Sequence, residues 1–310
     1  MKIFVTGGGG FIGSSLILSL QKDHEIVCFG HGGNYSQLKQ LCGKNVKLVD
    51  GEITDRKLLN KEMKGIDAVV HLAGPAGNKA CIKDPAKATM AHAIGTHAVL
   101  QEAISNNVDK FLFASTQSAY TTYKKRKIPF TEDMSLEPDD FYATLKTMAE
   151  YEIQGSKINY GILRFANVYG YGSGLFMTKV GGAIGNFIKA TFDGSEITMY
   201  GEGSQGIDYV HVNDVCNAVE MILDKNVKRE IFNIGSGNLI TIGQLAEKVS
   251  KLAKSVLNNS VTIKKLPAPE GSIWPDRLMS IKNVNEKVGW KPSTSLDEGI
   301  KEMLIKGAKK

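Results

Sequence analysis

Residues 6–13 read TGGGGFIG, and they lie between a short apolar run at residues 2–6 and a helical pattern. The glycines satisfy both the G-x-G-x-x-G and the G-x-x-G-x-x-G spacings. Without side chains the backbone can turn sharply and bring its N–H groups against a pyrophosphate, and the helix N-terminus adds a partial positive charge. The stretch therefore predicts a dinucleotide-binding turn between the first strand and the first helix.

The residues around this turn alternate short apolar runs with helical patterns as far as residue 165. The runs are rich in Val, Ile and Phe and do not alternate with polar residues, which is typical of strands buried on both faces of a parallel sheet. The predicted strands are residues 2–6, 25–29, 46–49, 68–72, 110–114 and 160–164, and the predicted helices include residues 14–21, 85–105 and 142–154. Such a β-α-β series predicts a doubly wound α/β fold.

The pattern changes after residue 167, where a Gly-rich, loop-like segment begins. We therefore expect a dinucleotide-binding domain over residues 1–167, with returning segments near residues 208–235. A smaller, discontinuous substrate-binding domain is expected mainly over residues 168–310. Its predicted elements are a helix near residues 180–190, strands at 209–212 and 231–234 with a helix at 214–223 between them, a helix at 242–252 and a loop at 267–275.

Composition excludes several classes of protein. The 310 residues are 42% hydrophobic and 23% charged, which is ordinary for a globular protein. The net charge of +6 is spread thinly apart from residues 124–127 and 306–310, so we expect no nucleic-acid surface. No apolar run approaches the roughly 18–20 residues of a membrane span, and we expect no signal peptide, because an apolar strand follows Met1 without a charged segment. The four cysteines show no metal-ligand spacing, so we expect no metal site and a reduced, cytoplasmic setting.

The choice of dinucleotide stays open in the sequence. An acidic residue about 20 positions after the glycines normally holds the adenosine ribose. Here the second strand ends Cys28-Phe29-Gly30-His31, without a carboxylate or an arginine. His31 and Lys39 are candidates to face a 2′-phosphate, and an unengaged loop is the alternative interpretation. The cofactor is therefore NAD or NADP.

Tyr142 and Lys146 open a predicted helix and are four residues apart, so they share one helix face. A lysine ammonium beside a phenol lowers the pKa of the phenol from about 10 toward neutrality. A proton-transfer group that works near pH 7 needs such a pKa. The Y-x-x-x-K pattern is common by chance, but here it accompanies the dinucleotide turn and a strand that ends at Thr116.

At this point the chain resembles the extended short-chain dehydrogenases/reductases, which are nucleotide-sugar epimerases, dehydratases and ketoreductases. The resemblance covers nearly the whole chain and implies a Rossmann sheet with a smaller substrate domain. The matching motifs, in order, are TGGGGFIGS (6–14), DGEITD (50–55), HLAG (71–74), YATLK (142–146), RFANVYG (164–170), GEGSQGIDYVHVNDV (201–215), FNIGSG (232–237) and GWKPSTSLDEGI (289–300).

The resemblance implies roles for individual residues. Tyr142 would be the general acid/base, Lys146 would lower its pKa and hold the nicotinamide ribose, and Thr116 would hydrogen-bond the reacting oxygen. Asn167 would contact the substrate near its diphosphate, unless it only forms a turn. With His31 added from the strand end, the candidate cofactor contacts are Gly7, Gly10, Phe11, Ile12, Gly13, His31, Glu52, Ile53, Leu72, Ala73, Gly74, Tyr142, Lys146 and Ala166.

Some positions depart from the family pattern. Gln117-Ser118 stand where family dehydratases carry Asp-Glu, which disfavours 4,6-dehydration. Ile207 stands where the family usually has an arginine that binds the substrate diphosphate. Arg277 is a candidate to supply that contact instead. The alternative is that Arg277 is an ordinary surface arginine. His92 stands where an Asn usually braces the active site, and we favour a structural histidine there.

We therefore expect hydride transfer at a carbon of a nucleotide-linked sugar, with C4 epimerisation as the leading hypothesis. The alternatives are an NADPH-dependent ketoreductase of a nucleotide-linked 4-keto sugar, a reductase of a non-nucleotide carbonyl, and a non-catalytic scaffold that binds cofactor. The intact Thr116, Tyr142 and Lys146 set argues against the scaffold. The resemblance also implies a homodimer paired through helices 85–105 and 142–154, which carry more apolar residues than one sheet-facing stripe needs.

Overall fold

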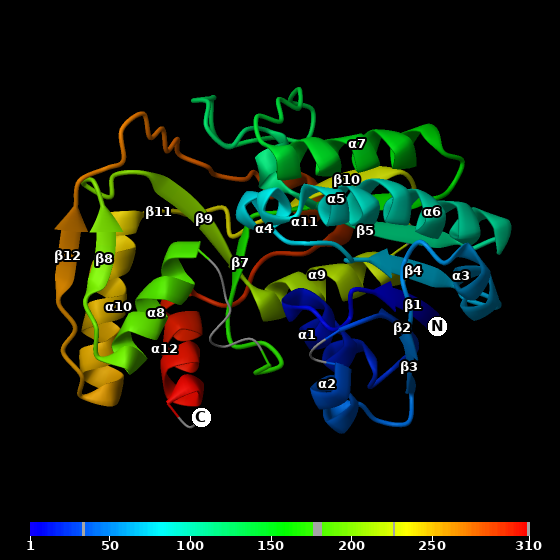
Figure 1. Cartoon of the computed structure of the whole chain (residues 1–310), viewed down its shortest axis with the longest axis horizontal. Coiled ribbons are helices and arrows are strands. Elements are labelled where there is room, and N and C mark those ends of the chain that lie inside the picture. The colour runs from blue at the N-terminus through cyan, green and yellow to red at the C-terminus, as the bar shows by residue number, and fades with distance from the viewer. Residues whose placement is uncertain (33–34, 176–181, 226, 309–310) are drawn as a thin grey trace.

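The computed structural model describes residues 1–32, 35–175, 182–225 and 227–308 (Figure 1). Its centre is a seven-stranded sheet in the order β10-β6-β5-β4-β1-β2-β3, and every neighbouring pair is parallel. The strands are β1 Lys2–Thr6, β2 Glu25–Gly30, β3 Val46–Asp50, β4 Ala68–His71, β5 Lys110–Thr116, β6 Tyr160–Phe165 and β10 Glu230–Ile234. The strand order reverses beside β1, so the predicted doubly wound fold is confirmed.

Both faces of this sheet are buried, as the continuous apolar runs predicted. Within β1, Ile3 and Val5 point into a core formed with α1 Phe11–Leu20 and α9 Val212–Asp224. Phe4 points into a second core on the opposite face, formed with α3 Arg56–Glu62, α6 Thr96–Ser105 and α7 Phe141–Gly155. The remaining helical elements beside the sheet are α2 Tyr35–Leu41, α4 Asn78–Lys83, α5 Pro85–Thr89, η1 Met90–Gly95, η2 Gln117–Ala119 and α11 Lys282–Val288.

The single helix expected over residues 85–105 is three helical pieces in the structure. The α5 turn leads into a π-helical turn, η1, and then into α6. A π-helical turn accommodates an extra residue, which periodicity in the sequence does not reveal. It changes which side chains face inward, and it buries His92.

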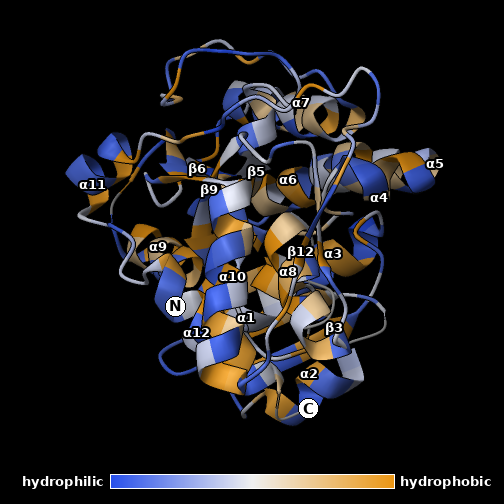
Figure 2. Cartoon of the chain, turned by 90° about the vertical axis from the view of Figure 1, so that its left-hand side faces the viewer, coloured by the Kyte–Doolittle hydropathy of each residue, from blue (hydrophilic) through white to orange (hydrophobic). Residues whose placement is uncertain are grey.

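The other part of the chain forms two small sheets with helices packed on them. One sheet has the order β11-β9-β7 and the other pairs β12 with β8. A shared core joins them to the amphipathic helices, and α10 turns a largely hydrophilic surface to the viewer in Figure 2. The elements are β7 Asn167–Tyr169, α8 Gly182–Asp193, β8 Ile197–Tyr200, β9 Gly206–His211, β11 Leu239–Thr241, α10 Ile242–Leu257, β12 Ile263–Leu266 and α12 Leu296–Gly307.

Several sequence-based boundaries need correction here. The helix expected near residues 180–190 is α8, and residues 180 and 181 lie outside the described residues. Val212 begins α9 instead of ending the preceding strand. The C-terminal 70 residues hold α11 and α12 besides α10. The sequence did carry a signal for α12, because Ser295 and Glu298 form a capping box at its start.

The returning segments divide between the two parts of the molecule. β10 pairs with β6 in the large sheet and α9 packs in its core, whereas β9 pairs with β7 and β11. The exact domain limits near residue 167 stay a prediction. Every helix within the described residues is too short or too polar to cross a bilayer.

Candidate active site

The glycine turn folds into a cradle against the end of β4. Gly7 has φ +70°, and a Cβ there would lie 2.8 Å from the backbone nitrogen of Ala73. A Cβ on Gly13 would lie 2.3 Å from the carbonyl oxygen of Gly7. Gly10 is the N-cap of α1, and among the described residues no side chain caps that helix start. A close backbone approach and a helix N-terminus without a side-chain cap fit a pyrophosphate, so these residues would hold a dinucleotide.

Thr6, the last residue of β1, ties the turn to the loop after β4. Its hydroxyl oxygen accepts hydrogen bonds from the backbone N–H groups of Leu72 and Ala73, each at 3.2 Å. The same oxygen lies 2.6 Å from Nδ1 of His71. The predicted cofactor contacts Leu72, Ala73 and Gly74 thus lie beside the glycine turn, at the carboxyl edge of the sheet. Phe11 and Ile12 open α1 at the same edge.

The strand ends beyond β1 hold the candidates for the adenosine half of the cofactor. His31 follows β2, and its Nε2 lies 3.4 Å from the carboxylate of Glu52, which follows β3. Both side chains are exposed. The Ile53 side chain instead packs in the core, against Gly95. Glu52 and Ile53 are the two predicted cofactor contacts after β3. The Glu52 side chain is exposed and can reach a ligand, whereas the Ile53 side chain is buried in the core.

The catalytic candidates meet where β5 ends and α7 begins. Asp140 is the N-cap of α7 and accepts a 2.7 Å hydrogen bond from the N–H of Ala143, which fixes the first turn with Tyr142. Thr116, at the end of β5, hydrogen-bonds the Tyr142 side chain. The ammonium of Lys146 is buried, donates to the carbonyl oxygen of Ala114 at 2.7 Å, and lies 4.6 Å from the centre of the Phe113 ring. The structure therefore brings Thr116, Tyr142 and Lys146 together.

The pKa shifts of Tyr142 and Lys146 differ from those expected from the sequence. Burial and the nearby Cys81 thiol raise the pKa of Tyr142 above its usual value near 10, although the hydrogen bond with Thr116 opposes them. Burial lowers the pKa of Lys146 to about 8, against the influence of Cys81 and Glu150. The pKa of the phenol is therefore raised and not lowered in this arrangement, because burial disfavours the charged phenolate. The role of Lys146 in lowering that pKa stays a prediction.

His92 lies next to the cofactor loop and the catalytic tyrosine. Its ring packs directly on Gly74, where a Cβ would lie 2.3 Å from the imidazole, and it meets the Tyr142 ring edge-on at 5.7 Å. Nε2 donates to the carbonyl oxygen of Pro75 at 2.9 Å, and burial lowers the pKa of His92 to about 3. His92 is therefore a neutral, buried side chain that supports the loop, consistent with the structural role we favoured.

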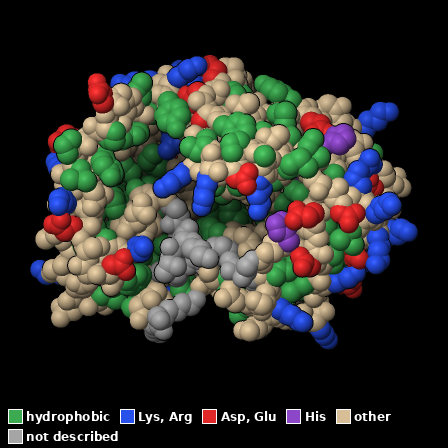
Figure 3. All heavy atoms as spheres, in the orientation of Figure 1, with side chains coloured by type: hydrophobic (Ala, Val, Ile, Leu, Met, Phe, Trp, Pro, Cys, Tyr) green, Lys and Arg blue, Asp and Glu red, His purple; other side chains and the backbone are tan. Residues whose placement is uncertain are grey.

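The substrate candidates line a cavity of about 270 Å³. Its wall includes Asn167, which lies two residues after Phe165, the β6 partner of Thr116. Asn167, Ile207, Tyr209, Trp274 and Arg277 contribute to its walls. The face in Figure 3 is hollowed between the two parts of the molecule, and hydrophobic side chains are visible in the hollow.

Arg277 lies directly across from Ile207, the position that lacks the usual arginine. The two residues form a parallel β-bridge, in which the Arg277 N–H donates to Gly206 and its carbonyl accepts from Asp208. Nε of Arg277 is buried and has no hydrogen-bond partner within the part of the chain that the structure describes. A buried donor of this kind is costly unless a ligand or water satisfies it.

The remaining predicted residues lie around this group. Ala166, at the end of β6, is buried and donates its N–H to the carbonyl oxygen of Ile234 in β10. The amide nitrogen of Asn167 donates to the carbonyl oxygen of Asp208 at 3.4 Å. Backbone N–H groups of the Gly-rich segment from Gly170 to Gly182 are a further candidate for the diphosphate contact, and residues 176–181 of that segment lie outside the described residues.

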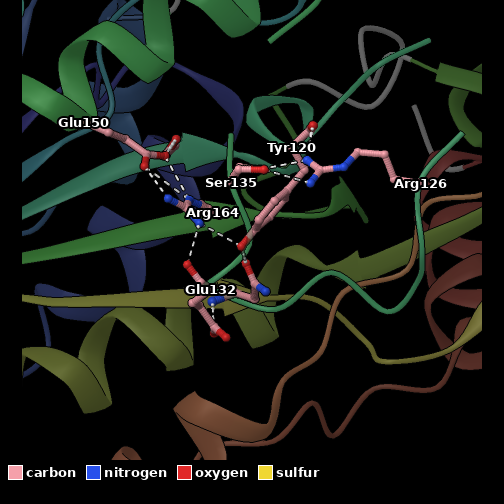
Figure 4. A network of polar contacts seen from close by, with 8 residues as sticks. Tyr120, Arg126, Glu132, Ser135, Glu150 and Arg164 are labelled. Carbon is pink, nitrogen blue, oxygen red and sulfur yellow. Dashed lines mark hydrogen bonds and ion pairs between the residues drawn. The ribbon is translucent and has the colours of Figure 1, made fainter. Parts of the chain in front are cut away.

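A buried polar network joins β6 to β5 and α7, the two elements that carry the catalytic residues (Figure 4). Arg164 donates from Nε and Nη2 to the carboxylate of Glu150, with Nη2 at 2.7 Å, and from Nη1 to the Tyr120 hydroxyl at 2.8 Å. Tyr120 in turn donates to Asn233 at 2.8 Å. Ser115, next to Thr116, donates to the same Glu150 carboxylate. No sequence pattern predicted this network, although Arg164 and Asn233 stand inside the matched motifs.

Comparisons with known proteins place these features in a family. Residues 3–235 match the profile of the NAD dependent epimerase/dehydratase family. UDP-N-acetyl-alpha-D-glucosaminuronate decarboxylase of Bacillus cytotoxicus is 29% identical over 98% of this chain and 96% of its own length. The dTDP-D-glucose 4,6-dehydratase of Mus musculus is 28% identical over 98% of this chain and 87% of its own.

A solved structure agrees with the sequence relatives. UDP-glucose 4-epimerase of Thermotoga maritima, solved with UDP-glucose, is 27% identical and has a TM-score of 0.88, covering 100% of this chain and 99% of that one. These relatives catalyse different reactions on nucleotide sugars, so the family alone does not select one of them. The profile, the sheet order and the extent of these matches show that this chain belongs to the NAD-dependent epimerase/dehydratase family of extended short-chain dehydrogenases/reductases.

Proposed function

We propose that this protein is a nucleotide-sugar 4-epimerase that uses NAD or NADP. One observation carries the proposal: Thr116, Tyr142 and Lys146 meet at the carboxyl end of β5. In the sheet, β5 lies between β6, which leads to Asn167 in the cavity wall, and β4 and β1, which lead to the glycine cradle. The cofactor site and the sugar site would therefore be adjacent, and the proton-transfer group formed by Thr116, Tyr142 and Lys146 would lie between them.

In the proposed reaction the nicotinamide, when bound, supplies a reversible hydride acceptor at the sugar carbon. Tyr142 accepts the proton of the 4-hydroxyl and later returns it, and Thr116 holds the reacting oxygen by a hydrogen bond. Because burial raises the pKa of Tyr142, the phenol needs added positive charge to ionise near neutral pH. The Lys146 ammonium, one helical turn away, is the residue of this chain placed to contribute it.

The position after Thr116 supports epimerisation over dehydration. Gln117 is buried, and its amide oxygen has no hydrogen-bond partner among the residues that the structure describes. An amide cannot exchange a proton as a carboxylic acid does, so Gln117 offers no acid or base for eliminating water. A 4-ketoreductase remains a second candidate, favoured by the missing carboxylate at Gly30.

An assay without added cofactor tests the proposal. A 4-epimerase is redox-neutral, so the purified protein should interconvert UDP-glucose and UDP-galactose, or another 4-epimeric pair of uridine or thymidine diphosphate sugars, while absorbance at 340 nm shows no net turnover of NADPH. Stoichiometric NADPH oxidation with a 4-keto sugar would instead establish the reductase. Formation of a 4-keto-6-deoxy product would contradict our preference for epimerisation over dehydration.

We predict that Arg277→Ala weakens binding of a nucleoside diphosphate sugar by about 10- to 150-fold, because a charge-assisted contact of about 1.5–3 kcal/mol is lost. Calorimetry with uridine, thymidine, guanosine and cytidine diphosphates measures the effect. Lys264→Ala, which removes an exposed positive charge on β12, should leave affinity unchanged. Equal binding by the Ala variant would remove Arg277 from the site, and no binding by the wild type would favour a non-nucleotide substrate.

We predict that affinity for NAD⁺ falls as pH rises through about 8. Burial lowers the pKa of Lys146 to about 8, so the ammonium is present below that pH and is lost above it. Lys146→Met should bind weakly at pH 7 and change little up to pH 9.5, whereas Lys146→Arg should stay charged and lose the pH dependence. Calorimetry at several pH values is the measurement, and a flat wild-type profile would contradict the role of Lys146.

We predict a homodimer, formed through neighbouring helices that leave large apolar side chains exposed. Met90 and Ile94 are about half exposed on η1, as are Met148 and Tyr151 on α7. Ile94→Glu should shift the protein toward monomer in sedimentation velocity, because a charge would be buried at the interface. Ile305→Glu, on α12, is the matched control. A wild type that stays monomeric at all concentrations would refute the dimer.

We also propose that the protein is cytoplasmic.

A further inference from the structure

The carboxyl end of β2 lacks the acidic residue that usually hydrogen-bonds the adenosine ribose. In dinucleotide-binding sheets an Asp or Glu at this place accepts a hydrogen bond from the ribose 2′-hydroxyl. Here the strand ends at Gly30, next to the glycine turn: the N–H of Gly7 donates to the carbonyl oxygen of Phe29 at 3.1 Å. Something other than a residue-30 side chain must therefore contact the ribose.

Tyr35, the first residue of α2, fills the space that such a side chain would take. Its hydroxyl oxygen lies 3.1 Å from where a Cβ on Gly30 would be. Its ring lies 2.9 Å from where a Cβ on Gly9 would be. The half-buried ring thus lies across the gap between the glycine turn and the end of β2, and both glycines are needed for it to fit.

The Tyr35 hydroxyl has hydrogen-bonding capacity to spare for a ligand. It donates to the carbonyl oxygen of Cys28 at 3.3 Å, a long bond, and lies 3.3 Å from the Cys28 sulfur. A phenol oxygen that donates one hydrogen bond still accepts others. Burial and the nearby Cys28 thiol raise the pKa of Tyr35, so the phenol stays neutral. A neutral group does not repel a phosphate as a carboxylate does.

The charged groups around this place come from the neighbouring strand ends. Asp50 and Glu52 belong to the end of β3, and both are exposed, so solvent screens them. His31 lies 3.4 Å from the Glu52 carboxylate and offsets part of its charge when protonated. Lys39 lies in the last turn of α2. The end of β2 itself contributes no negative charge.

We propose that Tyr35 takes the place of the missing carboxylate at the adenosine ribose, and that the site therefore binds NAD and NADP with similar affinity. This inference rests on the proposed cofactor site and adds the residue that sets its selectivity. The phenol oxygen accepts the 2′-hydroxyl hydrogen of NAD while the phenol keeps its long bond to the Cys28 carbonyl oxygen. With NADP, the phenol gives up that bond and donates its hydrogen to the 2′-phosphate.

Calorimetry with NAD⁺ and NADP⁺ tests the inference without relying on activity. The wild type should bind the two within about tenfold of each other. Tyr35→Phe keeps the ring over both glycines and loses the hydroxyl, so NAD⁺ affinity should fall about 2- to 10-fold, in line with one lost hydrogen bond. Tyr200→Phe, which removes an exposed phenol on β8, is the matched control and should change neither affinity.

A charge-restoring variant tests selectivity directly. Gly30→Asp with Tyr35→Ala returns a carboxylate and removes the phenol that would contact it, so NADP⁺ affinity should fall at least tenfold relative to NAD⁺. Because residue 30 has φ +157°, the Asp strains the backbone, and thermal unfolding checks that the variant folds. A wild-type preference beyond tenfold for either cofactor, an unchanged NAD⁺ affinity in Tyr35→Phe, or an unchanged ratio in the double variant would each overturn the inference. Failure of the wild type to bind either cofactor would overturn the proposed function as well.

Discussion

Replacing Tyr142 with Phe is expected to lower turnover by about 10²- to 10⁴-fold while leaving NAD⁺ affinity nearly intact. The range is that of a positioned general acid or base. The Phe side chain keeps the ring contact with His92 and the packing near Cys81, so the loss is confined to the proton and the hydrogen bond with Thr116. Steady-state kinetics on the epimerised sugar, with calorimetry for the cofactor, measures both effects.

Tyr151 provides the matched control, because it lies on the same helix outside the catalytic group, and Phe keeps the ring that the proposed dimer would bury. Tyr151→Phe should keep wild-type turnover. If Tyr142→Phe also turns over at the wild-type rate, the assignment of Tyr142 as the acid/base is wrong. If it instead loses NAD⁺ binding, the ring contributes to the cofactor site more than the proton-transfer proposal requires.

Removing Arg164 from the buried network should cost about 3–5 kcal/mol of unfolding free energy. Arg164 is 2% exposed and Glu150 is 0% exposed, so Arg164→Met leaves an unpaired carboxylate in a dry interior. The Tyr120 hydroxyl loses its donor at the same time. Urea denaturation, fitted for the free energy of unfolding, is the measurement.

Two further variants test whether the loss of stability in Arg164→Met comes from leaving a buried charge without its partner. Lys287→Met breaks the exposed ion pair with Glu230 and should cost at most about 1 kcal/mol. Arg164→Met combined with Glu150→Leu removes both charges and should recover part of the loss, since no charge is then left buried without its partner. A cost for Arg164→Met as small as that for Lys287→Met would mean that water reaches Glu150, contrary to its complete burial.

Local features of the sequence determined most of the fold. Continuous apolar runs predicted six strands of the large sheet, because a strand covered on both faces needs no polar alternation. The glycine turn was predictable because its spacing specifies backbone geometry over a few residues. The shared helix face of Tyr142 and Lys146 followed from a separation of four residues. The position of α12 was also encoded locally, by the capping box of Ser295 and Glu298.

Contacts between distant segments decided what the sequence left open. The pKa of Tyr142 depends on how completely the phenol is desolvated, and packing against Cys81 and Ala88 sets that burial. Arg277 lies opposite Ile207 because a bridge joins residues 70 positions apart, which no local pattern records. Tyr35 covers Gly30 only because α2 folds back over the glycine turn. Dielectric environment and through-space distance control proton affinity and ligand contacts, and both arise only once the chain has folded.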